Sequence, residues 1–125
     1  MEAAEASPAA AAVCAQKILK YLQKQYFTKP SFQYNAIMLI RILADNPGHK
    51  FTRNFDDEFV KTVKEVLKSP DPSVYQMMME TLEAFESNKA DDENLAPLLA
   101  MWQRKKKDSY KRHGVRVVGL CYRLA

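Results

Sequence analysis

The amino-acid sequence predicts an all-α protein, a right-handed α-α superhelix with about five main helices. Three observations support this fold class. The 125 residues include only three glycines, which favours helices joined by short corners. Apolar residues recur every three or four positions in five segments, as in amphipathic helices. Two of these segments, 42 residues apart, resemble each other, and helical repeats of about this length stack into superhelices.

Composition and charge indicate a small globular protein with one basic end. The length suits one domain, and a hydrophobic content of 47% suffices for a core. The net charge is +4, but from Arg104 onward eight Lys and Arg residues and one Asp give +7, which leaves −3 for the rest. The acidic start lacks the apolar core of a secretory signal, and no segment approaches the roughly 18 apolar residues of a membrane span. We therefore expect a cytoplasmic protein.

The first helix is predicted over residues 7–24, and the Ala-rich start over residues 1–8 is expected to be disordered. Ser7 is a suitable N-cap, and Pro8 fits the first helical position. The buried side is expected to comprise Val13, Ile18, Leu19 and Leu22. The exposed side is expected to comprise Lys17, Lys20 and Lys24, which recur three and four residues apart.

The second helix is predicted over residues 30–46, with Thr28 as its candidate cap. Its inward face is expected to comprise Phe32, Ala36, Ile37, Leu39, Ile40 and Leu43. Because so much of its surface is apolar, we expect it to pack against more than one neighbour.

The corner after this helix, DNPGHKFTRNF, raises the question of a phosphate-binding loop. Such a loop requires G-x-x-x-x-G-K-[ST] between a strand and a helix, whereas here a single Gly48 follows a helix. We interpret Asn46, Pro47 and Gly48 as a helix stop, with Gly48 free to adopt a positive φ. Phe51 and Phe55 are then expected to fold back as wedges between helix layers.

Three further helices are predicted over residues 56–68, 71–86 and 95–110. The second of them starts at Asp71, a good cap that is followed by Pro72. Their apolar seams are Phe59, Val63, Val66 and Leu67; Val74, Met78, Thr81, Leu82 and Phe85; and Leu95, Leu98, Leu99 and Trp102. The acidic loop SNKADDEN before the last helix is expected to be solvated.

The order and spacing of these elements resemble a VHS domain, a member of the ENTH/VHS superfamily. The corner has the family's Asn-x-Gly-x-x-Phe form, and an acidic-Phe-Val start of the next helix follows it. The matching residues are Asn46, Gly48, Phe51, Glu58, Phe59 and Val60. The match covers residues 9–110, and the two helices that precede this stretch in the family are absent, so the chain resembles an N-terminally truncated VHS domain. Residues 111–125 form an atypical tail.

The resemblance implies a non-catalytic adaptor module in endosomal or Golgi protein sorting. Its implied partners are ubiquitin or ubiquitinated cargo, adaptor proteins and phosphoinositide membranes, on which it would be peripheral. Gln33, Ile37 and Arg41 lie on the helix face that the absent family helix would flank, so they are the candidate ubiquitin-binding residues. The groove between the last two helices binds acidic dileucine signals in some VHS domains. Here its first wall is acidic, which argues against that function.

Two groups of basic residues are the candidate sites for phosphoinositides or other anions. Each lysine near an anionic membrane contributes roughly 1 kcal/mol to the binding free energy. They are Lys17, Lys20 and Lys24, and Arg104, Lys105, Lys106 and Lys107. Nucleic acid is not expected, because stacking aromatics are not interleaved with these lysines. No catalytic, metal or cofactor site is expected, since His49 and His113 lie far apart in the sequence.

Two alternatives to the adaptor hypothesis stay open at this point. One is a helical-repeat scaffold that binds partner proteins without a trafficking role, and the other is a basic helical nucleic-acid binder. The absent helices also predict an uncovered apolar flank, and with it marginal stability or self-association.

Overall fold

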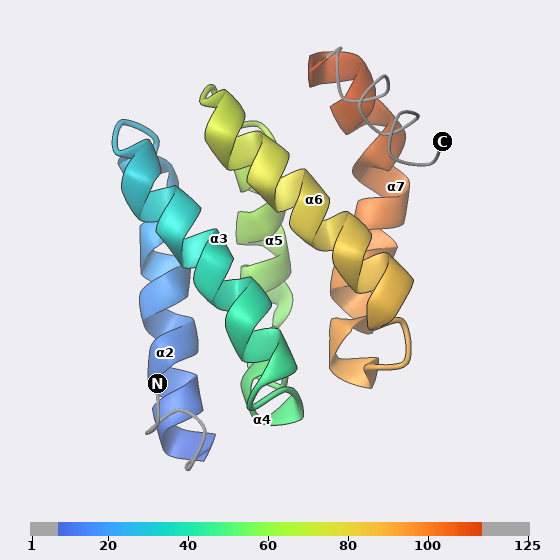
Figure 1. The fold of residues 1–125 in the computed structure, drawn as a ribbon. Helices are drawn as coiled ribbons and strands as arrows, with labels where there is room; N and C mark the ends of the chain where they lie inside the picture. The colour runs from blue at the N-terminus through green and yellow to red at the C-terminus, as the bar shows by residue number, and fades with distance from the viewer. Residues whose placement is uncertain (1–7, 114–125) are drawn as a thin grey trace.

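The computed structural model describes residues 8–113, and this part of the chain contains helices and connecting loops but no β-strand (Figure 1). The elements are α2 (Pro8–Tyr21), η1 (Lys24–Tyr26), α3 (Pro30–Asp45), α4 (His49–Thr52), α5 (Asp57–Val66), α6 (Pro72–Asn88), η2 (Glu93–Leu95) and α7 (Ala96–His113). The predicted all-α fold is confirmed.

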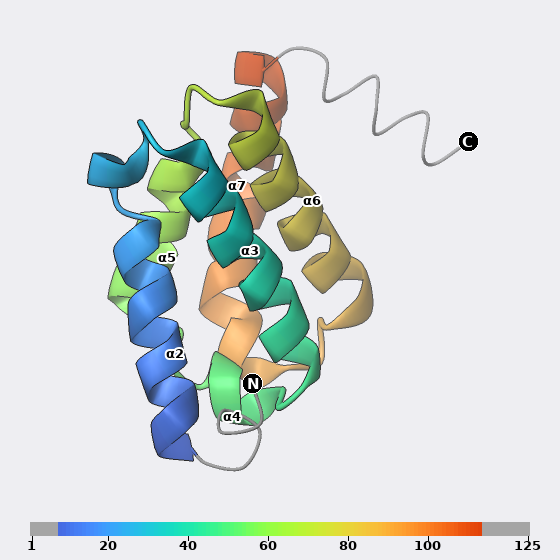
Figure 2. The ribbon, with the colours of Figure 1, turned by 60° about the vertical axis from the view of Figure 1, so that its left-hand side comes forward.

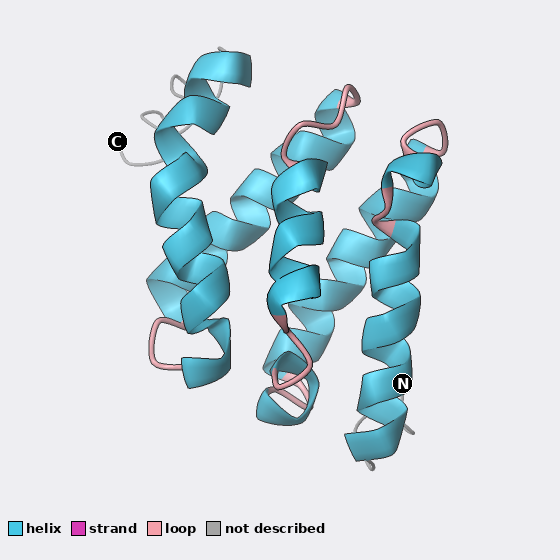
Figure 3. Ribbon diagram, turned by 180° about the vertical axis from the view of Figure 1, so that it is seen from behind, coloured by secondary structure: helices cyan, strands magenta, loops and turns pink. Residues whose placement is uncertain are grey.

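The helices are arranged in two layers. α3 and α6 lie side by side in one layer, and α2, α5 and α7 form the other, which faces the viewer in Figure 3. The short α4 closes the lower end of the array near α2 and α3 (Figure 2). The α2 and α3 pair therefore forms one end of the array, and α7 forms the other.

The helix ends follow from local chemistry. Asp71 accepts hydrogen bonds from the backbone N–H groups of Ser73 and Val74 at 2.9 and 3.3 Å, which confirms the predicted cap of α6. Asp56 caps α5 in the same way, through the N–H of Phe59. The predicted cap Thr28 is wrong, since Lys29 occupies the N-cap of α3 without a side-chain bond and Pro30 begins the helix.

The helix ends of α2 and α7 differ most from the sequence prediction. α2 ends at Tyr21 rather than at residue 24, because Gln23 adopts an extended backbone and its side-chain amide satisfies the carbonyl of Leu19 at 3.2 Å. α7 continues to His113, so the predicted end of the last helix at residue 110 is wrong, whereas the predicted division into a domain and a tail stays a prediction. Ser7 and residues 114–125 lie outside the described residues, and Pro8, within the predicted disordered start, is helical.

The core is one cluster to which α2, α3, α5, α6 and α7 all contribute. The predicted seams of α5, α6 and α7 are all buried. Burial of an apolar side chain such as Ile37 contributes roughly 1.5–3 kcal/mol to the free energy of unfolding. The burial predicted for Val13, Phe32 and Leu39 is wrong, since they are 51%, 45% and 37% exposed. They lie on the outer side of the end pair, where no described helix covers them.

The corner after α3 confirms the helix-stop interpretation. Gly48 has a φ of 70°, a region that other residues rarely adopt. Phe51 and Phe55 are buried as predicted, and the ring of Phe55 stacks on Phe59 with a centroid distance of 4.1 Å. The four residues of α4, which the sequence did not predict as a helix, bring these rings into the core.

A polar network joins this corner to the loop before α7. The hydroxyl of Thr52 donates to Asp92 at 2.9 Å, and the amide of Asn94 donates to Thr52 at 3.2 Å. His49 lies 3.4 Å from the same carboxylate, and Asp92 is buried. The prediction of a fully solvated acidic loop is therefore wrong, because Asp92 ties the two corners together while also capping η2.

Candidate functional site

The residues predicted to bind ubiquitin do not form an accessible surface. Gln33 and Ile37 are completely buried, and the Gln33 amide donates to the backbone carbonyl of Gln23 at 3.2 Å. Arg41 is half-buried and its guanidinium lies 3.7 Å from the sulfur of Met77 on α6. This side of α3 faces the rest of the protein, so Gln33 and Ile37 are corrected from contact residues to core residues.

The exposed surface of α3 lies on the opposite side of the helix and is apolar. Leu39 follows Phe32 by seven residues, and Ile42 follows Leu39 by three. In a helix this spacing brings the three side chains onto one stripe. Together with Met38 they form what we call the outer stripe, and all four side chains are exposed. With Val13 on α2, they are the exposed large hydrophobic side chains of the described residues. Apolar surface gathered in this way is typical of an interaction site.

A groove of about 370 Å³ runs between α2 and α3 beside the outer stripe. Its walls are almost entirely apolar. They comprise Cys14, Lys17, Ile18 and Tyr21 from α2, and Phe32, Asn35, Ala36, Leu39 and Leu43 from α3. Phe32 packs against the rings of Tyr21 and Tyr26, with centroid distances of 5.7 and 6.2 Å, and closes one end. We call this site the α2–α3 groove.

The charge around the α2–α3 groove is positive. α2 contains no acidic residue, and Asp45, the single acidic residue of α3, forms an ion pair with Lys89. Lys17 lines the groove, and Lys20 and Lys29 lie over the rings of Tyr21 and Phe32, each 5.7 Å from the ring centroid. Apolar walls with a cationic rim suit the binding of an apolar surface on another protein that has acidic residues at its edge.

The predicted basic group on the first helix is only partly assembled. Lys17 and Lys20 are exposed on α2 as expected. Lys24 leaves the group because α2 ends before it, and its ammonium pairs with Glu65 on α5 at 3.1 Å. The hydrogen bond from Lys24, aided by the positive charges of Lys68 and Lys64, outweighs burial and lowers the pKa of Glu65.

The side chains of the predicted basic run, residues 104–107 of the last helix, point in three different directions. At 100° per residue, Arg104 and Lys107 share the outward face of α7 and are exposed. Lys105 faces α5 and lines a cleft with Lys64 and Lys68. Lys106 points to α6, so residues 104–107 do not form the single anion-binding surface that the sequence suggested.

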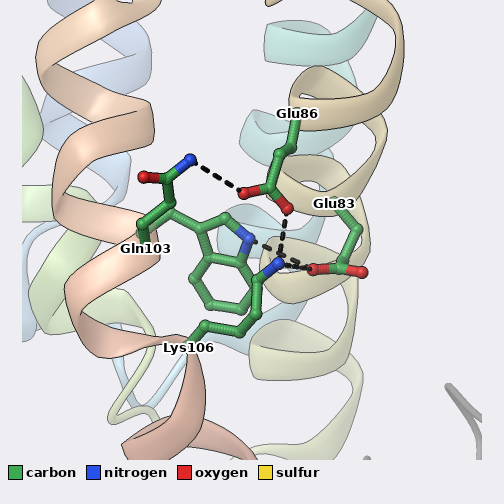
Figure 4. A network of polar contacts seen from close by, with 5 residues as sticks. Glu83, Glu86, Gln103 and Lys106 are labelled. Atoms are coloured by element: carbon green, nitrogen blue, oxygen red, sulfur yellow. Dashed lines mark hydrogen bonds and ion pairs between the residues drawn. The ribbon is translucent and has the colours of Figure 1, made fainter.

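Lys106 belongs instead to a network that links α6 to α7 (Figure 4). Its ammonium pairs with Glu86 and, at 3.2 Å, with Glu83. Trp102 donates to Glu83 and Gln103 donates to Glu86, at 3.2 and 3.3 Å. Burial disfavours the ammonium, but the hydrogen bonds to Glu86 and Glu83 outweigh it and raise the pKa of Lys106. The acidic wall of α6 is thus engaged by α7.

The described residues contain no group of three or more His, Cys, Asp or Glu side chains placed to hold a metal ion. In the same part of the chain, none of the helices has the length and apolarity that crossing a bilayer requires.

Comparison of the chain with known protein families, with curated proteins and with solved structures gives no significant match. The function of the chain is therefore inferred from the geometry of the α2–α3 groove and its outer stripe. The sequence predicted an uncovered apolar flank but not its residues, because Val13, Phe32 and Leu39 were assigned to buried faces; the apolar residues on two sides of residues 30–46 were a signal for it.

Proposed function

We propose that the chain is a non-catalytic, VHS-like adaptor module of endosomal protein sorting, and that its α2–α3 groove and outer stripe bind ubiquitin. The observation that carries this proposal is that every exposed large hydrophobic side chain among the described residues lies on α2 or α3. In the VHS resemblance, α3 corresponds to a helix that contributes to the ubiquitin surface. The right-handed superhelix and the location on endosomal or Golgi membranes belong to the same proposal.

Apolar burial would supply the affinity. Area removed from water contributes about 25 cal/mol per Å², and the outer stripe presents three aliphatic or thioether side chains beside an aromatic one. Ubiquitin also carries an apolar surface, so the two surfaces match in polarity. Membrane attachment through phosphoinositides would rest on Lys17 and Lys20, which are exposed on the same end of the molecule.

The test is an NMR titration of isotope-labelled monoubiquitin with the full chain and two variants. The chain should shift resonances of ubiquitin's apolar patch, and Leu39→Asp should abolish those shifts. Ala100→Asp is the matched control, since it adds the same charge at an exposed site of α7 and should leave the shifts intact. Absent shifts with the folded chain, or shifts that survive Leu39→Asp, would contradict the proposal.

The second candidate is a helical scaffold without a trafficking role. Its supporting observation is the cationic rim of the α2–α3 groove, which favours an amphipathic helix with acidic flanks over a neutral partner. Affinity for such a helix that falls on Lys17→Glu and Lys20→Glu, combined with no ubiquitin shifts, would select this function.

A further inference from the structure

A second surface, unrelated to the α2–α3 groove, lies between the carboxyl-terminal halves of α5 and α7. These helices are neighbours in one layer (Figure 3). A cleft of about 180 Å³ separates their side chains there. It is lined by Lys64, Leu67, Lys68, Lys105, Asp108, Ser109 and Arg112. We call it the α5–α7 cleft.

The α5–α7 cleft is strongly positive. Four cationic side chains and the single carboxylate of Asp108 give it a formal charge of +3. The neighbouring carboxylate of Glu65 does not line the cleft and is paired with Lys24, so its attraction to Lys68 and Lys64 offsets their charge only in part. Within residues 8–113, none of the four cations has a carboxylate at ion-pair distance.

This concentration of charge carries a cost to the folded protein. Lys64 lies in the last turn of α5 and Lys68 in the turn that follows it, and both line the same cleft, where like charges repel each other. The negative carboxyl ends of α5 and α7 offset the cost for Lys64 and Arg112. They do not offset it for Lys105, which lies in the middle of α7. A bound anion would relieve the repulsion among all four side chains.

We propose that the α5–α7 cleft binds the phosphate group of a phosphorylated segment in a partner protein. A phosphoryl group carries about −1.5 to −2 charges and three acceptor oxygens, which suits four cationic donors. Ser109, on the floor of the cleft, adds a hydroxyl donor, and Leu67 supplies an apolar contact. A phosphorylated segment fits better than a lipid headgroup because the exposed large hydrophobics of residues 8–113 all lie on α2 and α3, leaving none beside the cleft to enter a bilayer.

This site is independent of the proposed ubiquitin surface. Figure 1 places α2 and α3 at one end of the array and α7 at the other, and the two sites share no lining residue. One proposal can therefore fail while the other stands.

The first experiment titrates the isotope-labelled full chain with inorganic phosphate at constant ionic strength, with chloride as the reference anion. Saturable shifts are expected at Lys68, Lys105 and Ser109. The Lys68→Gln/Lys105→Gln double variant should weaken binding about tenfold or more, because each charge-assisted contact contributes on the order of a factor of ten. Circular dichroism checks that it folds, and Ser109→Ala, which keeps all charges, should weaken binding less.

The matched control is Lys61→Gln/Lys107→Gln. It removes two exposed lysines from the same two helices, outside the α5–α7 cleft, and therefore changes the net charge equally. It should leave the phosphate affinity within about twofold, the scale of a long-range charge effect screened by salt. Shifts spread over the whole surface, or equal losses in both double variants, would overturn the proposal.

The second experiment identifies the source of the phosphate. The probes are the peptide Gly-Gly-phosphoserine-Gly-Gly, its unphosphorylated form, and phosphatidylcholine vesicles with and without phosphatidylinositol bisphosphate. The phosphorylated peptide should shift the same resonances as inorganic phosphate, and the unphosphorylated peptide should not. Vesicle binding that requires Lys68 and Lys105, without any response to the phosphopeptide, would assign the cleft to a lipid and overturn the proposed partner.

Discussion

α3 and α6 are the two related helices of the internal repeat, yet they present different surfaces. At the positions where α3 has Phe32 and Leu39, α6 has Val74 and Thr81, 42 residues later. The α3 side chains are exposed, whereas both α6 side chains are completely buried. α6 packs against α3, α5 and α7, while α3 packs against α2, α4 and α6 (Figure 1), and no described helix covers the stripe with Phe32 and Leu39. The difference teaches that position in the array, and not the helix pattern, decides which stripe is covered.

The largest expected effect compares one leucine in each helix. Leu82→Ala should lower the free energy of unfolding by about 2–5 kcal/mol, because a buried side chain leaves a cavity in the core. Leu39→Ala removes the same atoms from a side chain that is 37% exposed and leaves no closed cavity, so it should cost only about 1 kcal/mol. Urea unfolding of both variants measures the contrast. Equal losses would mean that α3 is covered in solution.

The link between the two corners of the repeat should give the next largest effect. Asp92→Ala leaves the buried hydroxyl of Thr52 without its acceptor and should cost about 1–3 kcal/mol. Asp91→Ala changes an exposed neighbour and should stay within about 0.5 kcal/mol. Both are measured by denaturant unfolding, and a negligible loss for Asp92→Ala would show that the corners are not coupled through this carboxylate.

The ion pairs of Glu65 and Lys106 should lose their contribution to stability at opposite ends of the pH range, Glu65 in acid and Lys106 in base. The pKa of Glu65 is lowered in the folded state, so its contribution is present above the ordinary carboxyl pKa and is lost as the pH falls through the folded value. The pKa of Lys106 is raised, so its contribution is present below the ordinary lysine pKa and is lost as the pH rises through the folded value. Side-chain NMR titration should show that Glu83→Gln/Glu86→Gln lowers the pKa of Lys106 and leaves that of Glu65 unchanged. An unmoved Lys106 would contradict the network.

A charge placed on the outer stripe should have a small effect on stability but a large effect on self-association. Ile42→Asp places a charge on the outer stripe of α3, at a side chain that is 49% exposed and near the negative end of the helix, and should lower the free energy of unfolding by about 1 kcal/mol or less. It should also reduce self-association at high protein concentration, because exposed apolar surface drives it. Sedimentation of this variant beside Ala100→Asp tests the point, and identical association in both would refute a role for the stripe.

Much of the fold was predictable from short-range patterns. Asp71 and Pro72 begin a helix because a capping carboxylate and a proline without an N–H suit its first turn. Gly48 ends one because it tolerates a positive φ. The functional surfaces were less predictable. Ile37 and Leu39 are similar side chains that a helix places on opposite sides, but the pattern does not state which of the two sides is covered.

The sequence by itself determined the all-α class, the helix starts at Pro30 and Pro72 and the aromatic wedges of the corner, because caps, prolines and apolar periods act within a few residues. Only the tertiary structure decided which apolar stripe remains uncovered. It also separated Lys105 from Lys106, because neighbours in a helix point 100° apart and meet different partners. It brought Lys64 and Arg112 to one cleft from helices far apart in the chain. Such contacts depend on the packing of whole helices, which short-range pattern does not specify.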